Sequence, residues 1–241
     1  MTNEPSAIMT DTETTGARGG ATGSPAQLNS SHPLGSHLEK MLSAPADARV
    51  ARTIGELATA MDHAAQGRAF SVAVSAIEPG HRMGLTTITL AALWGRWGVS
   101  TCLIELGSGS KSLGGAIART SPDLSSACNT AASGGTVTGI QRLHSRLPHC
   151  GVIAAGDADV MGLLSTGKLK ALIESLKQTH DRIVLAAPAI SSGFPFLALD
   201  DLSDRLVVSL VSGQSRGGPL RELAETAMVQ GLRPIEVIWH E

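Results

Sequence analysis

One stretch, residues 70–106, constrains the fold of this chain more than any other. An apolar run over residues 70–77 leads into a glycine-containing loop, and a helical segment at 85–97 follows. A second apolar run over residues 100–106 completes the pattern. Strand, loop, helix and strand in this order predict a βαβ unit. Because neither run alternates with polar residues, both predict strands of a parallel sheet that is buried on both faces.

The rest of the chain continues this alternation of apolar runs and helical segments. We expect further strands at 150–155, 182–187, 205–211 and 234–239, and helices at 165–179 and 217–230. Gly231 is expected to end the last helix as a C-cap. Residues 107–149 are rich in Gly, Ser and Thr, and predict one or two short helices and a flexible loop. The fold class is therefore α/β, with a mostly parallel β-sheet flanked by helices on both faces.

The chain divides into a tail and one domain. Residues 1–36 contain few large apolar side chains and many Thr, Ser, Gly and Ala, so they predict a disordered N-terminal tail. Apolar residues then recur at helical spacing over residues 46–66, which predicts an amphipathic helix. This helix is expected to pack on the body of a single domain that covers residues 45–241.

Composition excludes several classes of protein. The net charge of −2 gives no basic surface for nucleic acid. The three cysteines Cys102, Cys128 and Cys150 are widely spaced, which predicts neither a disulfide framework nor a zinc site. No apolar run is long enough to span a membrane, and the N-terminus lacks the apolar core of a signal peptide. We therefore expect a cytoplasmic protein with no membrane span of its own.

The loop after the first apolar run has the layout of a nucleotide-binding P-loop. In a P-loop, backbone amides cradle the phosphates, a lysine reaches the outer phosphates, and a Ser or Thr hydroxyl binds magnesium. The sequence Ser75-Ala-Ile-Glu-Pro-Gly80, followed by a helix, Gly98 and Leu103-Ile-Glu-Leu-Gly107, resembles the bacterial tyrosine kinases of capsule and exopolysaccharide synthesis. These kinases belong to the MinD/ParA-like P-loop ATPases, and the resemblance covers roughly residues 45–240.

The resemblance also implies that the catalytic motifs are degenerate. The P-loop lysine falls on Met83 and the magnesium-binding hydroxyl on Gly84. The two aspartates of the second motif become Glu105 and Gly107, and the acid of the third motif becomes Ala186. Methionine supplies no charge for phosphoryl transfer, and a single carboxylate makes a poor magnesium site.

A shifted register partly restores the loop. It places a hydroxyl at Thr86 or Thr87, but it leaves an apolar residue where the lysine belongs. The Arg82 guanidinium could take the place of the lysine, or the side chain simply faces water. The candidate nucleotide-binding residues of this degenerate loop are Gly80, Arg82, Gly84, Thr86 and Thr87.

Each of these residues also has a plainer interpretation. Glu105 is either a remnant of the acid of a nucleotide site or a solvated residue at the end of a strand. Thr86 and Thr87 either contact phosphate or cap a helix. Trp94 is expected in the core, whereas an exposed Trp97 would indicate a contact with a protein partner.

The function that the resemblance implies is non-catalytic. The chain contains no tyrosine, so it cannot phosphorylate a tyrosine cluster of its own as active members do. We expect a pseudokinase without cofactor that acts as a docking or regulatory subunit of a capsule or exopolysaccharide export system. Its partner would be the membrane chain-length regulator, or co-polymerase, which would bring it to the inner membrane. Homo-oligomerisation is left open, because only fragments of the family's ring-forming motif survive in residues 50–57.

Two alternatives remain. The first is a weak ATP-binding protein or nucleotide sensor that takes ATP or ADP with magnesium at the degenerate loop. The second is a MinD/ParA-like positioning protein. That class normally needs nucleotide-driven dimerisation, and MinD adds a membrane-binding helix for which the segment after Trp239 offers no room.

Overall fold

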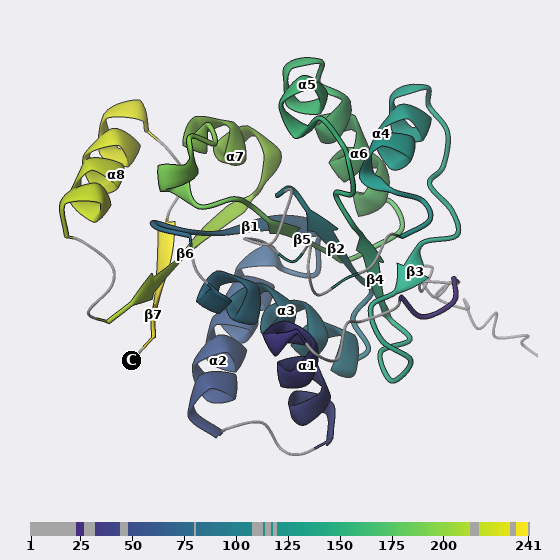
Figure 1. The fold of residues 1–241 in the computed structure, drawn as a ribbon, viewed down its shortest axis with the longest axis horizontal. Coiled ribbons are helices and arrows are strands. Elements are labelled where there is room, and N and C mark those ends of the chain that lie inside the picture. Colours follow the sequence, from purple (N-terminus) through teal and green to yellow (C-terminus); the bar gives the residue numbers. More distant parts are fainter. Residues whose placement is uncertain are drawn as a thin grey trace, which may run out of the picture.

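The body of the chain forms a central sheet with helices on both faces (Figure 1). The computed structural model describes residues 23–26, 32–43, 48–79, 81–107, 113, 117, 120–212, 217–231 and 235–240. Within these residues, seven strands form one sheet in the order β3-β4-β2-β5-β1-β6-β7.

The sheet is parallel except at one edge. Its strands are β1 (Phe70–Ala76), β2 (Thr101–Glu105), β3 (Gln141–Arg142), β4 (Cys150–Ile153), β5 (Arg182–Ala186), β6 (Arg205–Val211) and β7 (Ile235–His240). The short strand β3 pairs antiparallel with β4, and every other pairing is parallel. All residues of β1, β2 and β5 are buried, as expected for strands that are covered on both faces.

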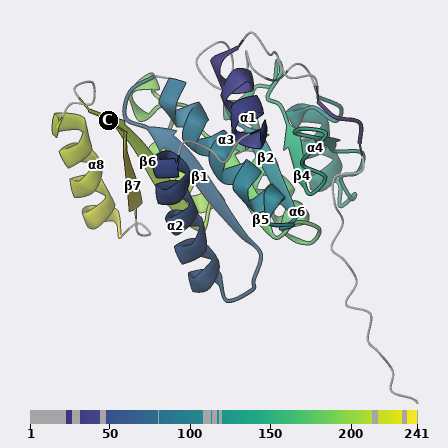
Figure 2. The ribbon, with the colours of Figure 1, turned by 90° about the horizontal axis from the view of Figure 1, so that it is seen from below.

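Three helices cover one face of the sheet, which Figure 2 shows from below. They are α1 (Pro33–Ser43), α2 (Ala48–Ala65) and α3 (His81–Arg96). Five helices lie on the opposite face: α4 (Leu124–Ala132), α5 (Val160–Ser165), α6 (Lys168–Lys177), α7 (Phe196–Leu202) and α8 (Gly217–Gln230). None of the helices in the described part of the chain is long and apolar enough to cross a membrane.

The core consists mainly of aliphatic side chains, and a polar network ties α2 to the amino end of the sheet. Asp62 of α2 accepts hydrogen bonds from Arg182 Nε (2.7 Å) and from Trp94 Nε1 (3.1 Å). The guanidinium carbon of Arg182 lies 4.4 Å from the ring centroid of Phe70, and Trp94 packs edge-on against the same ring. One carboxylate therefore joins α2, α3 and β5.

The predicted fold class is confirmed, and several boundaries need correction. The tail does not extend to residue 36, because α1 begins at Pro33 and Leu34 is buried; residues 1–22 lie outside the described residues. The helix expected at 85–97 begins earlier, at His81. The helix expected at 165–179 is two helices, α5 and α6, separated by Gly167 in a left-handed conformation. Gly231, with φ of 63°, ends α8 as expected.

Candidate functional site

The degenerate loop lies at the carboxyl edge of the sheet. Strand β1 ends at Ala76 and α3 begins at His81, so the connection is short. Neighbouring strands β5 and β2 end at the same edge. In open α/β sheets, ligands bind in the crevice outside the carboxyl ends of the strands, so this edge is the natural place for a site.

Met83, which the sequence comparison predicts at the position of the P-loop lysine, is a core residue. Its side chain is buried in the apolar cluster between α3 and α1, which also contains Leu34, Leu38 and Leu113. Helix α1, which begins at Pro33 within the predicted tail, therefore packs over the first turn of α3. The sequence contains a signal for this helix, since Leu34, Leu38 and Met41 recur at helical spacing.

Gly84, which is predicted at the position of the magnesium-binding hydroxyl, lies against the end of the Leu34 side chain. A Cβ atom at this residue would lie 2.7 Å from Leu34 Cδ1 and 3.2 Å from Leu34 Cδ2. Real Cβ contacts are essentially never as short as 2.7 Å, so the Leu34 side chain would have to move before a serine or threonine could occupy the position. Helix α1 thus occupies the space that a hydroxyl would need.

The two threonine hydroxyls of the shifted register are engaged inside the protein. Thr86 Oγ1 lies 2.9 Å from His240 Nε2, in a hydrogen bond that joins α3 to β7. Thr87 Oγ1 donates to the Met83 carbonyl oxygen at 2.9 Å. Both side chains are fully buried within α3. The interpretation as helix caps is wrong, because the helix begins five residues before Thr86.

Glu105 and Ala186 are brought together as register partners on β2 and β5. Glu105 is almost fully buried, so the interpretation as a solvated residue is wrong. Its Oε2 accepts a hydrogen bond from the backbone N–H of Ala155 at 3.3 Å. The carboxylate therefore helps to hold the segment after β4, and its neighbour Ala186 offers no second acid.

Beside these residues lies a cleft of about 410 Å³. It is lined by Pro79, Leu106, Gly107, Ala158, Asp159, Val160, Met161, Pro188, Ala189, Ser192, Gly193 and Phe194. The described lining residues include one acid, Asp159, and none with a positive charge. Asp159 Oδ1 accepts a hydrogen bond from the Gly162 N–H at 3.0 Å and so caps α5. Such walls suit an uncharged or cationic group better than a polyphosphate.

The structure separates the predicted site residues. Gly107 lines the cleft, whereas Met83, Gly84 and Thr86 face the core beneath the sheet. Gly80 lies outside the described residues, and so does the side chain of Arg82. Sequence analysis overlooked Asp159, although it follows the end of the strand predicted at 150–155 and therefore belongs to the same edge of the sheet.

Trp97 lies at the other end of α3. Its side chain is 49% exposed, whereas Trp94 is fully buried as expected. Helix α3 has 16 residues and is therefore about 24 Å long. Trp97 is thus remote from the degenerate loop, and a partner could reach it without approaching the cleft.

Comparison with solved structures identifies the fold. The kinase domain of VpsO has a TM-score of 0.67 at 18% identity, covering 87% of this chain and 99% of that chain. The BceF tyrosine kinase domain has a TM-score of 0.63 at 19% identity, covering 90% and 91%. A ParA family ATPase from Chlorobium tepidum has a TM-score of 0.52 at 12% identity, covering 72% and 74%.

At these identities the likeness concerns the fold. No protein-family model matches the sequence, and neither does any curated protein. The chain therefore has the α/β fold of the bacterial tyrosine kinase domains and, more widely, of ParA-like P-loop ATPases.

Proposed function

We propose that this protein is a pseudokinase: a kinase-like domain without phosphoryl-transfer activity that serves as a docking or regulatory subunit. It works in the synthesis and export of a bacterial capsule or exopolysaccharide. It is cytoplasmic and reaches the inner membrane through a chain-length regulator, or co-polymerase. Its fold, shared with bacterial tyrosine kinase domains, and its resemblance to their motifs support this proposal.

The observation that carries the proposal is the packing of α1 over the first turn of α3. Met83 stands where the lysine belongs and is buried among Leu34, Leu38 and Leu113. Gly84 stands where the hydroxyl belongs and is pressed against Leu34. Phosphoryl transfer depends almost entirely on positioning and on charges that stabilise the transferred group. Positions built into a core with apolar side chains contribute neither.

Calorimetric titration of the full chain with ATP and ADP, with and without magnesium, tests this. We expect no heat of binding and an unchanged melting temperature, since a ligand that bound the folded state would raise it. An active bacterial tyrosine kinase domain, titrated in parallel, is the positive control. Micromolar binding that requires magnesium would contradict the proposal and would make a nucleotide sensor the better account.

The nucleotide-sensor alternative is favoured by one observation, the cleft at the carboxyl edge. If any ligand binds, a titration with adenosine distinguishes a nucleotide sensor from a pseudokinase. A site that recognises phosphate should bind ATP and reject adenosine, because charge-assisted hydrogen bonds supply the affinity. A cleft whose described lining has one acid and no positive charge should bind adenosine at least as well as ATP. The second outcome would leave the pseudokinase proposal intact.

A further inference from the structure

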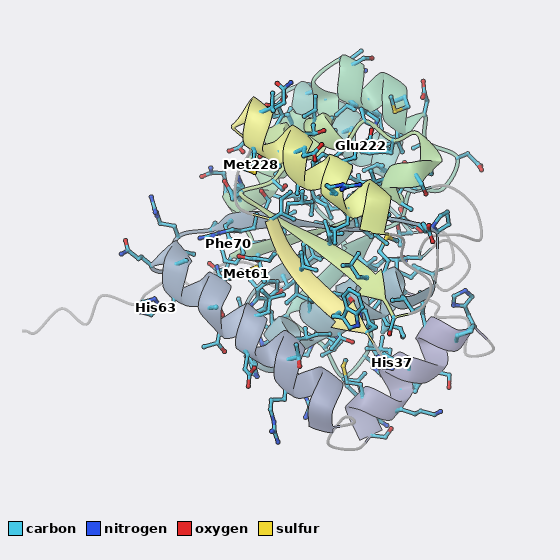
Figure 3. The ribbon with its side chains drawn as sticks, turned by 90° about the vertical axis from the view of Figure 1, so that its left-hand side faces the viewer. His37, Met61, His63, Phe70, Glu222 and Met228 are labelled. Atoms are coloured by element: carbon cyan, nitrogen blue, oxygen red, sulfur yellow. The ribbon has the colours of Figure 1, made fainter. Side chains whose placement is uncertain are left out.

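A second pocket, of about 470 Å³, opens at the amino edge of the sheet, opposite to the cleft. It lies between the end of α2 and the first residues of β1 and β6. Met61 and Phe70 form its apolar floor, and Figure 3 shows their side chains close together beside the sheet. Strand β1 has seven residues, so about 20 Å separates the pocket from the degenerate loop. A ligand in this pocket would therefore not reach the loop.

Two arginine side chains line this pocket. Arg68 lies in the turn that leads from α2 into β1, and Arg205 is the first residue of β6. Within the described part of the chain, the Arg68 guanidinium makes one long hydrogen bond, from Nε to the Ala65 carbonyl oxygen at 3.4 Å. Arg205 Nη1 lies 3.7 Å from Glu236 Oε1, beyond good hydrogen-bond distance. A guanidinium group has five N–H donors, so most donors of both arginines are available to a ligand.

The acids nearest to these arginines are paired with other groups. Asp204 is the one acid among the described residues that line the pocket. Its Oδ2 lies 2.9 Å from Lys177 Nζ and accepts hydrogen bonds from the backbone N–H and the hydroxyl of Ser71. Asp62 pairs with Arg182 Nε at 2.7 Å. Neither carboxylate therefore neutralises the arginines of the pocket.

The main chain that carries Arg68 is held in place. Its carbonyl oxygen accepts from Arg182 Nη1 at 3.2 Å, and its N–H donates to the Ala65 carbonyl oxygen at 3.0 Å. The second bond also caps the last turn of α2, whose unpaired carbonyl groups would otherwise repel an anion. Because this segment is already ordered, binding of a ligand costs less conformational entropy.

We propose that this pocket binds a small organic anion whose acidic group, a phosphate or a carboxylate, lies between Arg68 and Arg205. Its apolar part packs on Met61, Ala64 and Phe70. Guanidinium groups bind the oxygens of both acidic groups through paired N–H donors, and such charge-assisted hydrogen bonds are stronger than neutral ones. The site is independent of the proposed function, since it shares no described residue with the cleft.

The charge and the size of the pocket limit the ligand further. Three cations, Arg68, Arg205 and Lys177, lie in or next to the pocket with two acids, Asp204 and Glu236. The surplus is one positive charge, which an anion balances and a neutral molecule does not. The volume falls in the lower part of the range of roughly 300–1,000 Å³ for small-molecule sites, so an apolar body of one ring fits.

Titration of the full chain with phenyl phosphate and, separately, with benzoate tests the proposal, with amide NMR signals as the readout. We expect the signals of Ala64, Arg68 and Arg205 to shift, and that of Gly107, in the cleft, to stay unchanged. Phenol and inorganic phosphate each keep one half of phenyl phosphate, so they should bind about tenfold more weakly or worse. The acid that binds more tightly identifies the acidic group of the ligand.

Variants of the two arginines test the site itself. Arg68→Gln and Arg205→Gln should each raise the dissociation constant about tenfold or more, because each removes one guanidinium group. Ala64→Phe keeps both groups but fills the apolar side of the pocket, so it should also weaken binding. Arg52→Gln removes the same charge from an exposed position earlier on α2. It is the matched control and should leave binding unchanged.

Several results would overturn the proposal. One is the absence of amide shifts with both acids at about 10 mM, since a specific site for ligands of this size binds more tightly. Another is binding that neither arginine variant weakens, in proteins that keep the wild-type melting temperature. Phenol that binds as tightly as phenyl phosphate would show that apolar contact alone is recognised. Shifts confined to residues of the cleft would place the anion there and would contradict the assignment.

Discussion

At the scale of single residues, three residues that the resemblance assigns to a P-loop pack in the core instead. Met83 packs in the core between α3 and α1, and Gly84 leaves space for the end of the Leu34 side chain. Thr86 connects α3 to the last strand through His240. A lysine at residue 83 or a hydroxyl at residue 84 would disturb this packed core, so the apolar residue and the glycine both suit the packing.

Restoring the hydroxyl at Gly84 should therefore destabilise the protein. Gly84→Thr places branched atoms against Leu34, and overpacking of this kind typically costs about 1–3 kcal/mol. Urea denaturation measures the decrease in the free energy of unfolding. In a Leu34→Ala background the same change should cost much less, since the clash is relieved, and this coupling distinguishes crowding from helix propensity. Gly55→Ala, at a helical glycine with open space around it, should be neutral or stabilising. Equal effects of Gly84→Thr in both backgrounds would contradict the packing argument.

At the scale of elements, the sequence predicts the strands far better than the helices that cover them. Six apolar runs match six strands within a few residues, because strands buried on both faces read as uninterrupted apolar segments. The two-residue strand β3 is too short for any pattern. The first residues of α1, 33–36, fall within the predicted tail, because the segment before them has low hydrophobicity. The sequence also predicted the order of strand, loop and helix over residues 70–97, which the structure has as β1 and α3, but it could not show that α1 packs over Gly84, because that contact joins residues 50 apart.

The docking of α1 should depend on pH. His37 Nε2 lies 3.0 Å from Thr89 Oγ1 on α3, and burial, followed by the charge of Lys40, lowers the pKa of His37 below its ordinary value of 6.5. The unfolded state therefore binds the proton more readily than the folded state does. The stability that His37 contributes is present above pH 6.5 and is lost as the pH falls through the window below it.

Amide exchange of α1, corrected for its intrinsic pH dependence, measures this effect. Exchange should accelerate as the pH falls below 6.5 in the wild type and should change much less in His37→Gln. His63→Gln, at an exposed position on α2, is the control and should behave as the wild type does. His180 also has a pKa lowered by burial, but it lies between α6 and β5, so a local readout on α1 separates the two. An unchanged pH profile in His37→Gln would refute the role of this histidine.

The attachment of α2 should depend on one carboxylate. Asp62→Ala leaves Arg182 and Trp94 without their acceptor, and the loss should amount to about 2–4 kcal/mol, because both donors are buried. Asp62→Asn should cost less, since an amide oxygen still accepts one hydrogen bond. Glu56→Ala, on the exposed side of the same helix, should change stability by about 0.5 kcal/mol or less. Chemical denaturation and hydrogen exchange of the α2 amides measure these effects. A stable Asp62→Ala protein whose α2 amides stay protected would contradict the prediction.

At the scale of the whole molecule, three surfaces are separated by the body of the sheet. The degenerate loop and the cleft occupy the carboxyl edge, and Trp97 lies just beyond the far end of α3. Strand β7 forms one lateral edge of the sheet (Figure 1). In an active kinase the first of these surfaces would do the work. Here Met83, Gly84 and Thr86 face the core, and the docking role that we propose would use the other two surfaces.

The last prediction concerns Trp97 and the membrane partner that we propose, a co-polymerase. A half-exposed tryptophan at the end of a helix is a typical hot spot, and its loss from an interface costs about 2 kcal/mol or more, roughly a 30-fold weakening. Trp97→Arg should therefore reduce co-purification with the co-polymerase and fail to complement a deletion strain, while its unfolding free energy stays within about 0.5 kcal/mol of the wild type. Met228→Arg, on exposed α8, should complement fully. Because Trp97 is about 24 Å from the loop along α3, its effect should not change with added ATP. Full complementation by Trp97→Arg would show that the partner binds elsewhere, and the β7 edge would then be the surface to test.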